Sequence, residues 1–428
     1  MDQQSDEPTS TDARAGPRGA DGPREAASDR LRVCVFTSAH DATDSRVVGR
    51  EAVSLEEAGH DVTYYTPFEG DAPVETVTYA DADEGGMISI AERLRAAASV
   101  ARILADTDYD VYHFHDVECL PVGAFLSVAT DGTVVYDVHE NVEDTLAHKP
   151  IFPEPVRPYA AKAAGLVELG LSRVVDEIVT ASPDIAERFA GQDPTVVTNY
   201  PQRRWAEGTD PAKAIEPNTD EPTRLVYRGL LSENRGIRTL IEAVERIPDD
   251  YDVRLSVGGR YASEEEREAI EAQIAAADRV EFVEWFPSLE GMIDHFRAAD
   301  LGMMCFHPDP NKTDAVHRSN KLFQYMSAGL PVVVSDVGNW GELVAEEVGC
   351  GVAVEPADPD AVSEAVVELI DDPERRVALG RSGYRAALDR YNWESQRERL
   401  LGVYDRHGDY RGPVERGRAD ARRAEPTD

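Results

Sequence analysis

An alternation of short apolar segments with longer helical patterns constrains the fold of this chain most strongly. In the first half, the segments 31–38 (LRVCVFTS), 110–116 (DVYHFHD) and 133–139 (TVVYDVH) have the length and apolar content of buried strands. Helical patterns of about ten residues or more separate such segments, as at 47–58 and 90–104. Parallel strands need crossover connections of this length, so the pattern predicts an α/β protein with a parallel sheet.

The alternation stops where proline and acidic residues dominate, and a second series then runs from 224–230 (RLVYRGL) to 351–356 (GVAVEP). We therefore predict two Rossmann-like, doubly wound parallel-sheet domains that face each other across a cleft. The expected parts are a disordered tail (1–30), an N-terminal domain (31–200), a linker (201–222), a C-terminal domain (223–390), a C-terminal helix (391–406) and a second disordered tail (407–428).

The composition excludes some classes of function. The 428 residues include 82 Asp and Glu against 44 Lys and Arg, and the formal net charge is −38. Such a chain lacks the basic surface that binds a nucleic acid backbone, so we expect no nucleic acid partner. The acidity is similar to that of proteins from salt-accumulating organisms, in which molar salt screens the repulsion between like charges. A halophilic archaeon is therefore the expected source.

Membrane-spanning and metal-binding signals are also lacking. The longest apolar run, near 120–129, is shorter than the 18–20 residues that a membrane-spanning helix needs. The first thirty residues have no apolar core of a signal peptide, so we expect a cytoplasmic protein. The cysteines lie far apart, which predicts neither a structural metal site nor a disulfide framework; they are Cys34, Cys119, Cys305 and Cys350.

The strongest candidate site lies in the segment 319–336 (SNKLFQYMSAGLPVVVSD). Ser319 is placed to cap a helix and Gly329 to end it. At 100° per residue, one helix face is apolar and packs on the sheet, and the other looks into the cleft. On the second face, free N–H groups, the helix dipole and Lys321 would form an anion site suited to a diphosphate. An ordinary solvated face is the alternative. The apolar face holds Leu322, Phe323 and Met326, and the polar face holds Asn320, Lys321 and Gln324.

This segment resembles the nucleotide-sugar segment of glycosyltransferase family 4 enzymes, which have the two-domain GT-B fold. Other stretches are similar to the family in order and spacing, across about 31–405; they are 40–62 (HDATDSRVVGREAVSLEEAGHDV), 110–116, 135–141 (VYDVHEN) and 226–243 (VYRGLLSENRGIRTLIEA). The resemblance implies a retaining, metal-independent glycosyltransferase without a cofactor. Its partners would be a nucleotide-sugar donor and a glycan or polyprenyl-linked acceptor, with peripheral contact to the inner membrane face.

In the C-terminal half, the resemblance implies that Arg235 and Lys321 act catalytically by stabilising charge on the departing diphosphate. The residues implied to bind the nucleotide sugar are Gly229, Arg235, Ser319, Asn320, Lys321, Gln324 and Glu342. Four positions depart from the family pattern. Leu230 stands where an arginine is common and Arg235 where a lysine is common, and Val316 and Gln324 stand where many members have paired glutamates.

In the N-terminal half, His139 follows a strand at its carboxyl end, and the resemblance implies a catalytic residue that contacts the transferred sugar. A structural histidine with satisfied hydrogen bonds is the alternative. His113 is expected in the core. Arg46 would hold a phosphate of the donor or of a lipid-linked acceptor, or form a surface ion pair. The expected acceptor or loop residues are His40, Arg46, His115 and Asp116.

Two other functions fit the same architecture. A sugar-nucleotide epimerase would need acid and base residues at the sugar, and product analysis without an acceptor would reveal it. A catalytically silent nucleotide-sugar binder, suggested by Val316 and Gln324, would bind nucleotide without transfer or hydrolysis. A dinucleotide-dependent dehydrogenase is disfavoured, because no G-x-G-x-x-G follows the first strand of either half.

Overall fold

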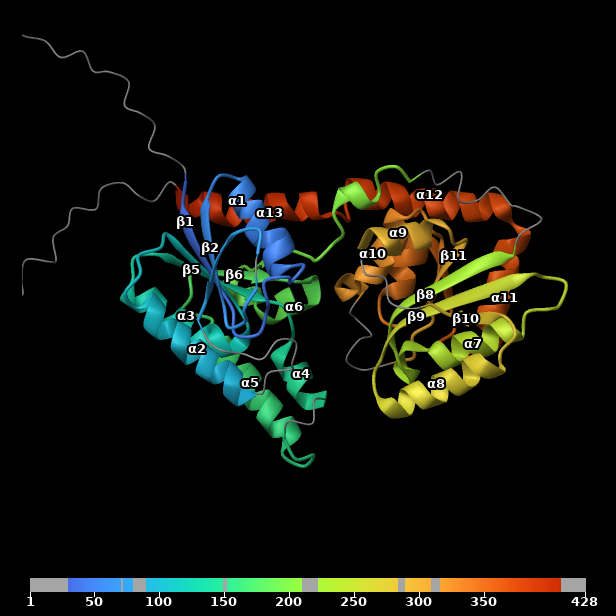
Figure 1. The fold of residues 1–428 in the computed structure, drawn as a ribbon, viewed down its shortest axis with the longest axis horizontal. Coiled ribbons are helices and arrows are strands. Elements are labelled where there is room, and N and C mark those ends of the chain that lie inside the picture. Colours follow the sequence, from blue (N-terminus) through green and yellow to red (C-terminus); the bar gives the residue numbers. More distant parts are fainter. Residues whose placement is uncertain are drawn as a thin grey trace, which may run out of the picture.

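The computed structural model describes residues 30–70, 72–79, 90–148, 152–209, 222–283, 289–308 and 316–408. These residues form two α/β domains, each built around a parallel sheet (Figure 1). The expected α/β class with two doubly wound domains is therefore confirmed. The expected tails, apart from Arg30, His407 and Gly408, lie outside the described residues, and so does most of the expected linker.

The N-terminal sheet has the strand order β3-β2-β1-β4-β5-β6-β7, and its strands pair in parallel. The order changes direction between β1 and β4, so the loops after these strands lead to opposite sides and leave a crevice for polar side chains. The strands are β1 (Arg32–Phe36), β2 (Asp61–Thr66), β3 (Glu75–Thr78), β4 (Val111–His115), β5 (Thr133–Val138), β6 (Glu177–Thr180) and β7 (Thr195–Val196).

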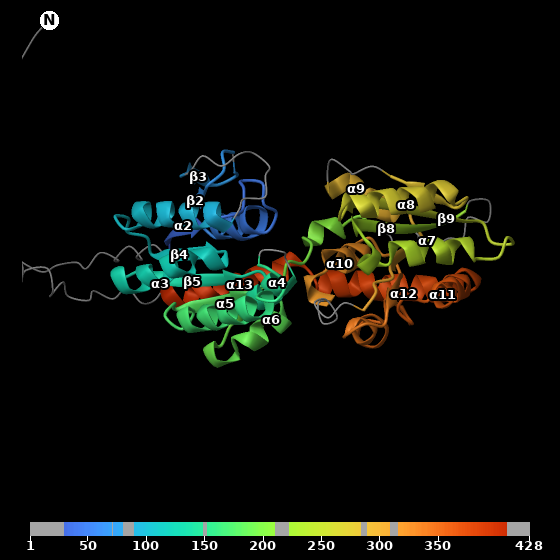
Figure 2. The same cartoon turned by 90° about the horizontal axis from the view of Figure 1, so that it is seen from below.

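Helices cover both faces of this sheet. Figures 1 and 2 show α2 (Ile90–Leu104), α3 (Leu120–Ala129) and α5 (Arg157–Leu171) along one side. On the other side lie α1 (Val53–Glu57) and the C-terminal helix α13 (Trp393–Gly408). The short helices α4 (Val142–His148) and α6 (Pro183–Arg188) follow β5 and β6.

The C-terminal sheet has the order β10-β9-β8-β11-β12-β13, with its change of direction between β8 and β11. Its strands are β8 (Thr223–Leu231), β9 (Val253–Tyr261), β10 (Val280–Phe282), β11 (Leu301–Met304), β12 (Val332–Ser335) and β13 (Gly351–Val354). Its helices are α7 (Ile237–Glu245), α8 (Glu264–Ala276), α9 (Leu289–Arg297), α10 (Asn320–Ser327), α11 (Pro359–Asp371) and α12 (Pro373–Asp389).

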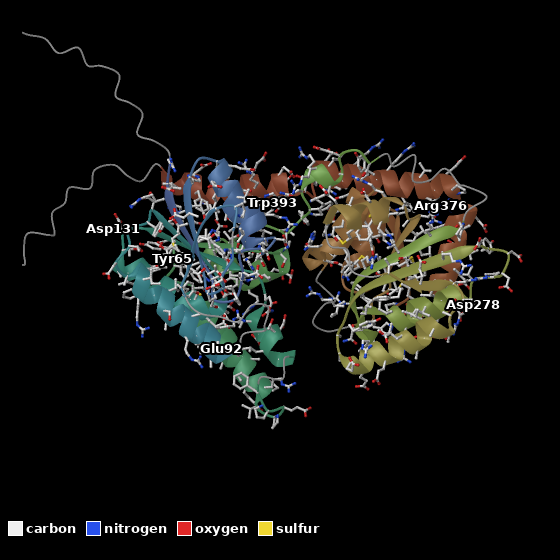
Figure 3. All side chains as sticks on the ribbon, viewed as in Figure 1. Tyr65, Glu92, Asp131, Asp278, Arg376 and Trp393 are labelled. Carbon is white, nitrogen blue, oxygen red and sulfur yellow. The ribbon has the colours of Figure 1, made fainter. Side chains whose placement is uncertain are left out.

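The chain returns to the N-terminal domain at its end. After α12, the backbone N–H of Trp393 donates to the carbonyl of Pro201, and the indole N–H donates to the Ser54 hydroxyl at 2.9 Å. Trp393, labelled in Figure 3, is buried in the core of the N-terminal domain together with Leu400 and Tyr404 of α13. The two domains are thus joined by two crossings of the chain.

Two local features were not predicted. The strand β3 is short and half-exposed, so it carries little apolar signal. The helical pattern over 47–58 is also not one regular helix, because its first part, η1 (Val47–Ala52), is a π-helical turn that continues into α1. No helix among the residues that the structure describes is long and apolar enough to cross a bilayer.

Candidate functional site

A glycine-rich turn shapes the carboxyl end of β8. Gly229 has a φ of 144° and Gly236 a φ of 67°, values that residues other than glycine rarely adopt. A Cβ at Gly229 would overlap the Lys321 side chain, and one at Gly236 would overlap the carbonyl oxygen of Cys305. Glycine at these two positions therefore lets the turn pass close to the Lys321 side chain and to the Cys305 carbonyl, and it places Arg235 at the end of this sheet.

One aromatic ring joins the two cations. The Arg235 guanidinium carbon lies 4.9 Å from the centre of the Phe306 ring, and the Lys321 Nζ lies 5.5 Å from the same centre. Lys321 also donates to the Tyr227 hydroxyl at 3.2 Å and lies over that ring. The Arg235 Nε is buried and has no hydrogen-bond partner among the described residues. The structure thus brings together the two positive charges that the sequence placed 86 positions apart.

The helix α10 has the expected faces. Leu322, Phe323 and Met326 are fully buried, whereas Asn320, Lys321 and Gln324 are half-buried on the other face. Gly329 has a φ of 73° and ends the helix as expected.

The helix start differs from expectation in one respect. Ser319 stands at the N-cap, but its hydroxyl makes no capping hydrogen bond.

Three further positions frame this site. Val316 is fully buried in the core of the C-terminal domain, so it has no polar role there. Leu230 is 39 % exposed at the end of β8. Glu342 is exposed at the first position of the helical turn η8 (Glu342–Glu347). Figures 1 and 2 show α10 at the edge of its domain that faces α4, the helix after His139.

In the N-terminal domain, His40 links the first loop to the end of β4. Its Nδ1 lies 2.9 Å from an Asp44 oxygen, and its Nε2 lies 3.4 Å from an Asp116 oxygen. Burial lowers the pKa of His40, but the hydrogen bonds and charges of Asp116 and Asp44 outweigh it and raise the pKa to about 10. His40 is therefore positively charged at neutral pH, with both ring nitrogens facing protein carboxylates.

Asp116 is a buried anchor. It has a φ of 71°, and its carboxylate accepts hydrogen bonds from the Thr37 hydroxyl, the Ser38 N–H and Arg93. With His40, these donors hold the pKa of Asp116 well below its usual range although burial opposes them. Its side chain is 5 % exposed. The carboxylate therefore has little exposed surface for contact with an acceptor. We infer that Asp116 instead holds Thr37, Ser38 and Arg93 in place through its hydrogen bonds.

Arg46 is the centre of a second buried cluster. Its NH1 donates to the Val197 carbonyl at 2.8 Å, and its NH2 lies 3.1 Å from both Asp137 oxygens. Its Nε lies 2.9 Å from a Glu51 oxygen and 3.1 Å from the His139 Nε2. The Arg46 side chain is only 7 % exposed. It does not form the expected surface ion pair, because its donors face residues of its own domain, and the expected phosphate contact stays a prediction.

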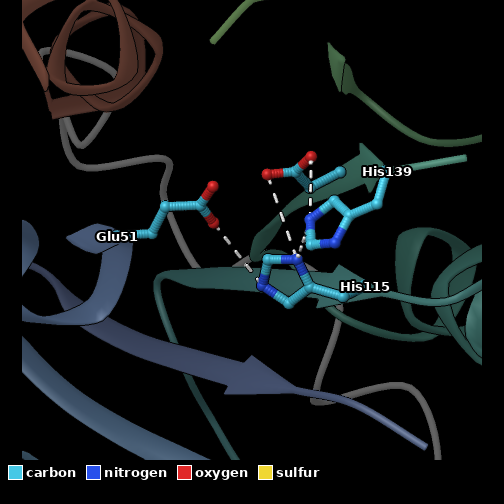
Figure 4. Close-up of side chains that lie close together, drawn as sticks. Glu51, His115 and His139 are labelled. Carbon is cyan, nitrogen blue, oxygen red and sulfur yellow. Dashed lines mark hydrogen bonds and ion pairs between the residues drawn. The ribbon is translucent and has the colours of Figure 1, made fainter. Parts of the chain in front are cut away.

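Two histidines complete this cluster (Figure 4). The His115 Nδ1 lies 2.9 Å from the His139 Nε2, and His115 is fully buried, so it cannot meet an acceptor directly. The His139 side chain is 17 % exposed. Burial lowers the pKa of His139; the Asp137 charge opposes this and the Arg46 charge adds to it. Both imidazoles are therefore neutral at neutral pH, because burial also lowers the pKa of His115. His113 is fully buried, as expected, with its Nδ1 2.6 Å from the Tyr404 hydroxyl.

Four of these side chains could hold a metal ion by type. One ligand atom each of Glu51, His115, Asp137 and His139 lies within 4.8 Å of the others. The Arg46 guanidinium, however, contacts three of these four side chains. The Arg46 cation already pairs with both carboxylates there, so the donor set is a poor fit for a resident divalent metal.

Sequence reasoning missed Glu51 and Asp137. Asp137 could have been found, because it precedes His139 by two residues and β-strand alternation puts both on one side. Glu51 could not, because it follows Arg46 by five residues, which lie apart on an α-helix. The π-helical turn η1 brings them together, and the Glu51 N–H donates to the Arg46 carbonyl at 2.9 Å.

Comparison with known proteins gives the family. Residues 45–200 match the model described as Glycosyltransferase Family 4, and residues 222–372 match the model described as Glycosyl transferases group 1. The chain is a glycosyltransferase of the family 4 type. The two matched regions correspond to the two domains of this glycosyltransferase. Its two parallel sheets and its similarity to solved structures give the GT-B fold.

Two curated relatives are mycobacterial mannosyltransferases. The MMP alpha-(1->4)-mannosyltransferase of Mycolicibacterium hassiacum is 25% identical over 72% of this chain and 73% of its own length. The GDP-mannose-dependent alpha-(1-6)-phosphatidylinositol monomannoside mannosyltransferase of Mycolicibacterium smegmatis is 28% identical over 50% of this chain and 63% of its own length. The chain thus spans less than two thirds of the second relative.

Solved structures agree in fold. Sucrose-phosphate synthase from Thermosynechococcus elongatus superposes with a TM-score of 0.66 at 19% identity, covering 88% of this chain and 98% of that one. HepE from Anabaena in complex with UDP superposes with a TM-score of 0.65 at 16% identity, covering 88% of this chain and 100% of that one. At these identities, the likeness supports the fold alone.

Proposed function

We propose that this glycosyltransferase moves a hexose from a nucleoside diphosphate sugar to a glycan or lipid-linked acceptor, with retention and without a metal. Two findings support a donor of this class. A curated relative is named as GDP-mannose-dependent, and a structural neighbour was solved with UDP and with UDP-glucose. No observation in the structure favours an epimerase or a silent binder.

The observation that carries the proposal is the pair of cations on Phe306. Arg235 and Lys321 lie against one ring, at the end of β8 and on the polar face of α10. A pyrophosphate carries its negative charge on adjacent groups, so two neighbouring cations and uncapped helix N–H groups match it. Arginine suits this place because its planar fork can bond two phosphate oxygens.

The same charges account for catalysis. In a front-face displacement, the attacking hydroxyl and the leaving diphosphate lie on one side of the sugar, and the diphosphate accepts the hydroxyl proton. The enzyme accelerates this reaction by stabilising the charge that develops on the phosphate. Arg235 and Lys321 would provide that stabilisation without a metal. Gln324 would bond the ribose hydroxyls, and being neutral it does not repel the diphosphate.

A donor screen tests the proposal. UDP-, GDP- and ADP-hexoses are incubated with the protein and glycan or polyprenyl-phosphate acceptors in molar potassium chloride, and products are read by mass spectrometry. We expect one nucleotide sugar to give an acceptor product of increased mass. NMR should show that the transferred sugar keeps the anomeric configuration that it had in the donor. Isomerised sugar nucleotide in the absence of any acceptor would instead support the epimerase, and saturable binding without turnover would support the silent binder.

We also propose that the acceptor reaches the enzyme at an anionic membrane. The face formed by α2, α3 and α5 exposes large apolar side chains on an otherwise acidic protein. The exposed charged side chains of these helices are Arg95, Arg102 and Lys162 against Glu92 alone. Apolar and cationic side chains together suit the interface of an anionic bilayer. The exposed apolar residues there include Leu94, Ile103, Phe125, Val128, Tyr159, Leu166 and Val167.

Vesicle sedimentation tests this contact. Wild-type protein should sediment with phosphatidylglycerol vesicles more than with phosphatidylcholine vesicles, and a Tyr159→Glu, Leu166→Glu variant should lose this binding. Phe282 is an exposed apolar residue of the C-terminal domain, outside this face, so Phe282→Glu is the control. Equal sedimentation of wild-type protein and the double variant would refute the membrane contact.

A further inference from the structure

We propose that a cavity at the amino ends of β8, β9 and β10 binds a phosphorylated monosaccharide. The cavity has a volume of about 520 Å³ and lies between these strands and the end of α9. Pockets of this size hold small molecules. The proposal goes beyond the proposed function, because the described lining of the cavity includes neither Arg235 nor Lys321.

The cavity and the proposed donor site lie at opposite ends of the C-terminal sheet. The turn that holds Arg235 follows the carboxyl end of β8, whereas Arg224, near the start of the same strand, lines the cavity. Arg224 precedes Gly229 by five residues. At about 3.3 Å per residue, these two positions of the strand are about 16 Å apart. A molecule in the cavity would therefore leave the donor site open.

Two arginines lie side by side at this end of the sheet. Arg224 of β8 pairs with Arg254 of β9 across the parallel ladder, and both residues are exposed. Residues paired in this way point to the same face of the sheet. Like charges on such neighbouring positions destabilise a sheet, and an anion bound between them would remove the repulsion.

The arginines also retain donors for an anion. Arg254 donates one hydrogen bond to the Asp278 carbonyl, and a guanidinium has five N–H groups. Arg279, which lines the cavity too, is paired with Asp249 at 3.0 Å. The planar fork of an arginine can bond two phosphate oxygens at once, so Arg254 suits a phosphate group.

Two acidic groups lie near these arginines. Glu281 is exposed and lines the cavity, where it stands against three arginines. The Asp300 carboxylate accepts a hydrogen bond from the backbone N–H of Arg224 at 2.7 Å and interacts with the charge of Arg376. The lining therefore has an excess of positive charge although the chain carries −38, and this excess favours an anionic ligand.

The inner wall of the cavity is polar and neutral. The Ser256 hydroxyl lies 3.1 Å from the His295 Nε2, and both residues line the cavity. Burial, with a further effect of Arg228, lowers the pKa of His295 to about 4, so the ring is neutral at neutral pH. A hydroxyl has one donor and two acceptor positions, so Ser256 can bond a ligand hydroxyl as well as His295.

The lining favours a monosaccharide over a nucleotide. None of the described lining residues has a phenyl, phenol or indole ring on which a base could stack. The apolar part of the wall consists of aliphatic side chains, and those of Ala298 and Ala299 are small. A phosphate at the paired arginines and a hydroxyl-bearing ring against Ser256 and His295 match this lining.

Calorimetric titration of the whole chain in molar potassium chloride tests the site. The probes are inorganic phosphate and the phosphates of glucose and mannose that carry the group at C1 or C6. We expect one sugar phosphate to bind at least about tenfold more tightly than inorganic phosphate, because its hydroxyls add hydrogen bonds. Saturating UDP or GDP should leave this affinity unchanged.

Two variants locate the binding. Arg224→Gln with Arg254→Gln removes the paired charges, and Ala298→Phe narrows the cavity while both arginines remain. Each should weaken sugar phosphate binding at least about tenfold and leave nucleotide binding at the wild-type level. Arg381→Gln, which removes an exposed arginine of α12 outside the cavity, is the control and should bind like the wild type.

The outcomes separate this site from the proposed donor site. Absence of binding by every sugar phosphate, or equal affinity for inorganic phosphate, would overturn the proposal. Binding that UDP or GDP displaces, or that both cavity variants keep, would also overturn it, because the molecule would then lie elsewhere on the protein. Absence of transfer with every donor would instead refute the proposed function and leave the titration of the cavity unaffected.

Discussion

The two domains use their charged residues in opposite ways. In the N-terminal domain, Arg46 and His40 are surrounded by carboxylates and carbonyls of the same domain. In the C-terminal domain, Arg235 and Lys321 lie on the faces of aromatic rings. Aromatic rings attract a cation without neutralising it. The comparison teaches that the cations of one domain hold side chains of that same domain in place, whereas the two cations of the other lie together against aromatic rings, where we propose that they bind an anion.

The largest expected effect comes from removing the two cations of the C-terminal domain. Arg235→Ala and Lys321→Ala should each lower kcat by about 10²–10³-fold, because charge on the leaving diphosphate loses a donor. Steady-state kinetics with the donor found by the screen measures this. Arg238→Ala removes an exposed arginine three residues further on and should have wild-type activity. Wild-type turnover in either variant would show that the cation removed does not stabilise charge on the leaving diphosphate, and the proposed difference between the domains would be wrong.

The next effect concerns the turn that places Arg235. Gly236→Ala should destabilise the protein by more than Gly349→Ala, since both have φ near 65° but only Gly236 lies against a carbonyl oxygen. The left-handed conformation alone costs about 1–2 kcal/mol with a side chain. Chemical denaturation measures both variants. Equal destabilisation would show that close packing against Cys305 does not fix the turn.

Salt should affect the stability of the whole folded protein. With a net charge of −38, the folded protein repels itself in dilute buffer, and molar salt shortens the screening length to about 3 Å. We expect the thermal midpoint measured by circular dichroism to be several degrees higher in 2 M potassium chloride than in dilute buffer. An identical midpoint in both would contradict adaptation to high salt.

The smallest effect is a pH dependence of opposite sign in the two domains. The pKa of His40 is raised to about 10, so its contribution to stability is complete below pH 6.5 and is lost as the pH rises toward 10. Burial, with a further effect of Arg228, lowers the pKa of His295 to about 4, so its contribution is complete above pH 6.5 and is lost toward pH 4.

Unfolding free energies between pH 4 and pH 10 check this pair. His40→Gln should flatten the alkaline side of the curve, and His295→Gln should flatten the acidic side. The same side flattened by both variants would contradict the assigned charge states.

The sequence predicted the C-terminal site better than the N-terminal one. The faces of α10 and the end at Gly329 follow from helical periodicity and glycine chemistry, which are local. The Phe306 ring that joins Arg235 and Lys321 lies far from both in sequence, and no local pattern indicates it.

The contacts within the cluster around Arg46 in the N-terminal domain do not follow from the α-helical periodicity of the sequence. The α-helical spacing assumed for 47–58 separates Arg46 from Glu51, whereas the π-helical turn joins them. The burial of His115 and Asp116 depends on Arg93 of α2 and on the Arg46 cluster, which only the tertiary fold brings to the ends of β4 and β5.

Calorimetric titration of UDP and GDP in molar potassium chloride tests the central claim most directly, namely that the cations of the C-terminal domain bind the diphosphate. We predict that one nucleotide binds the wild-type protein with an affinity at least about tenfold higher than it binds Arg235→Ala or Lys321→Ala, which corresponds to about 1.4 kcal/mol. An Arg46→Lys variant should bind like the wild type. Equal affinity for the wild type and both cation variants would contradict the account.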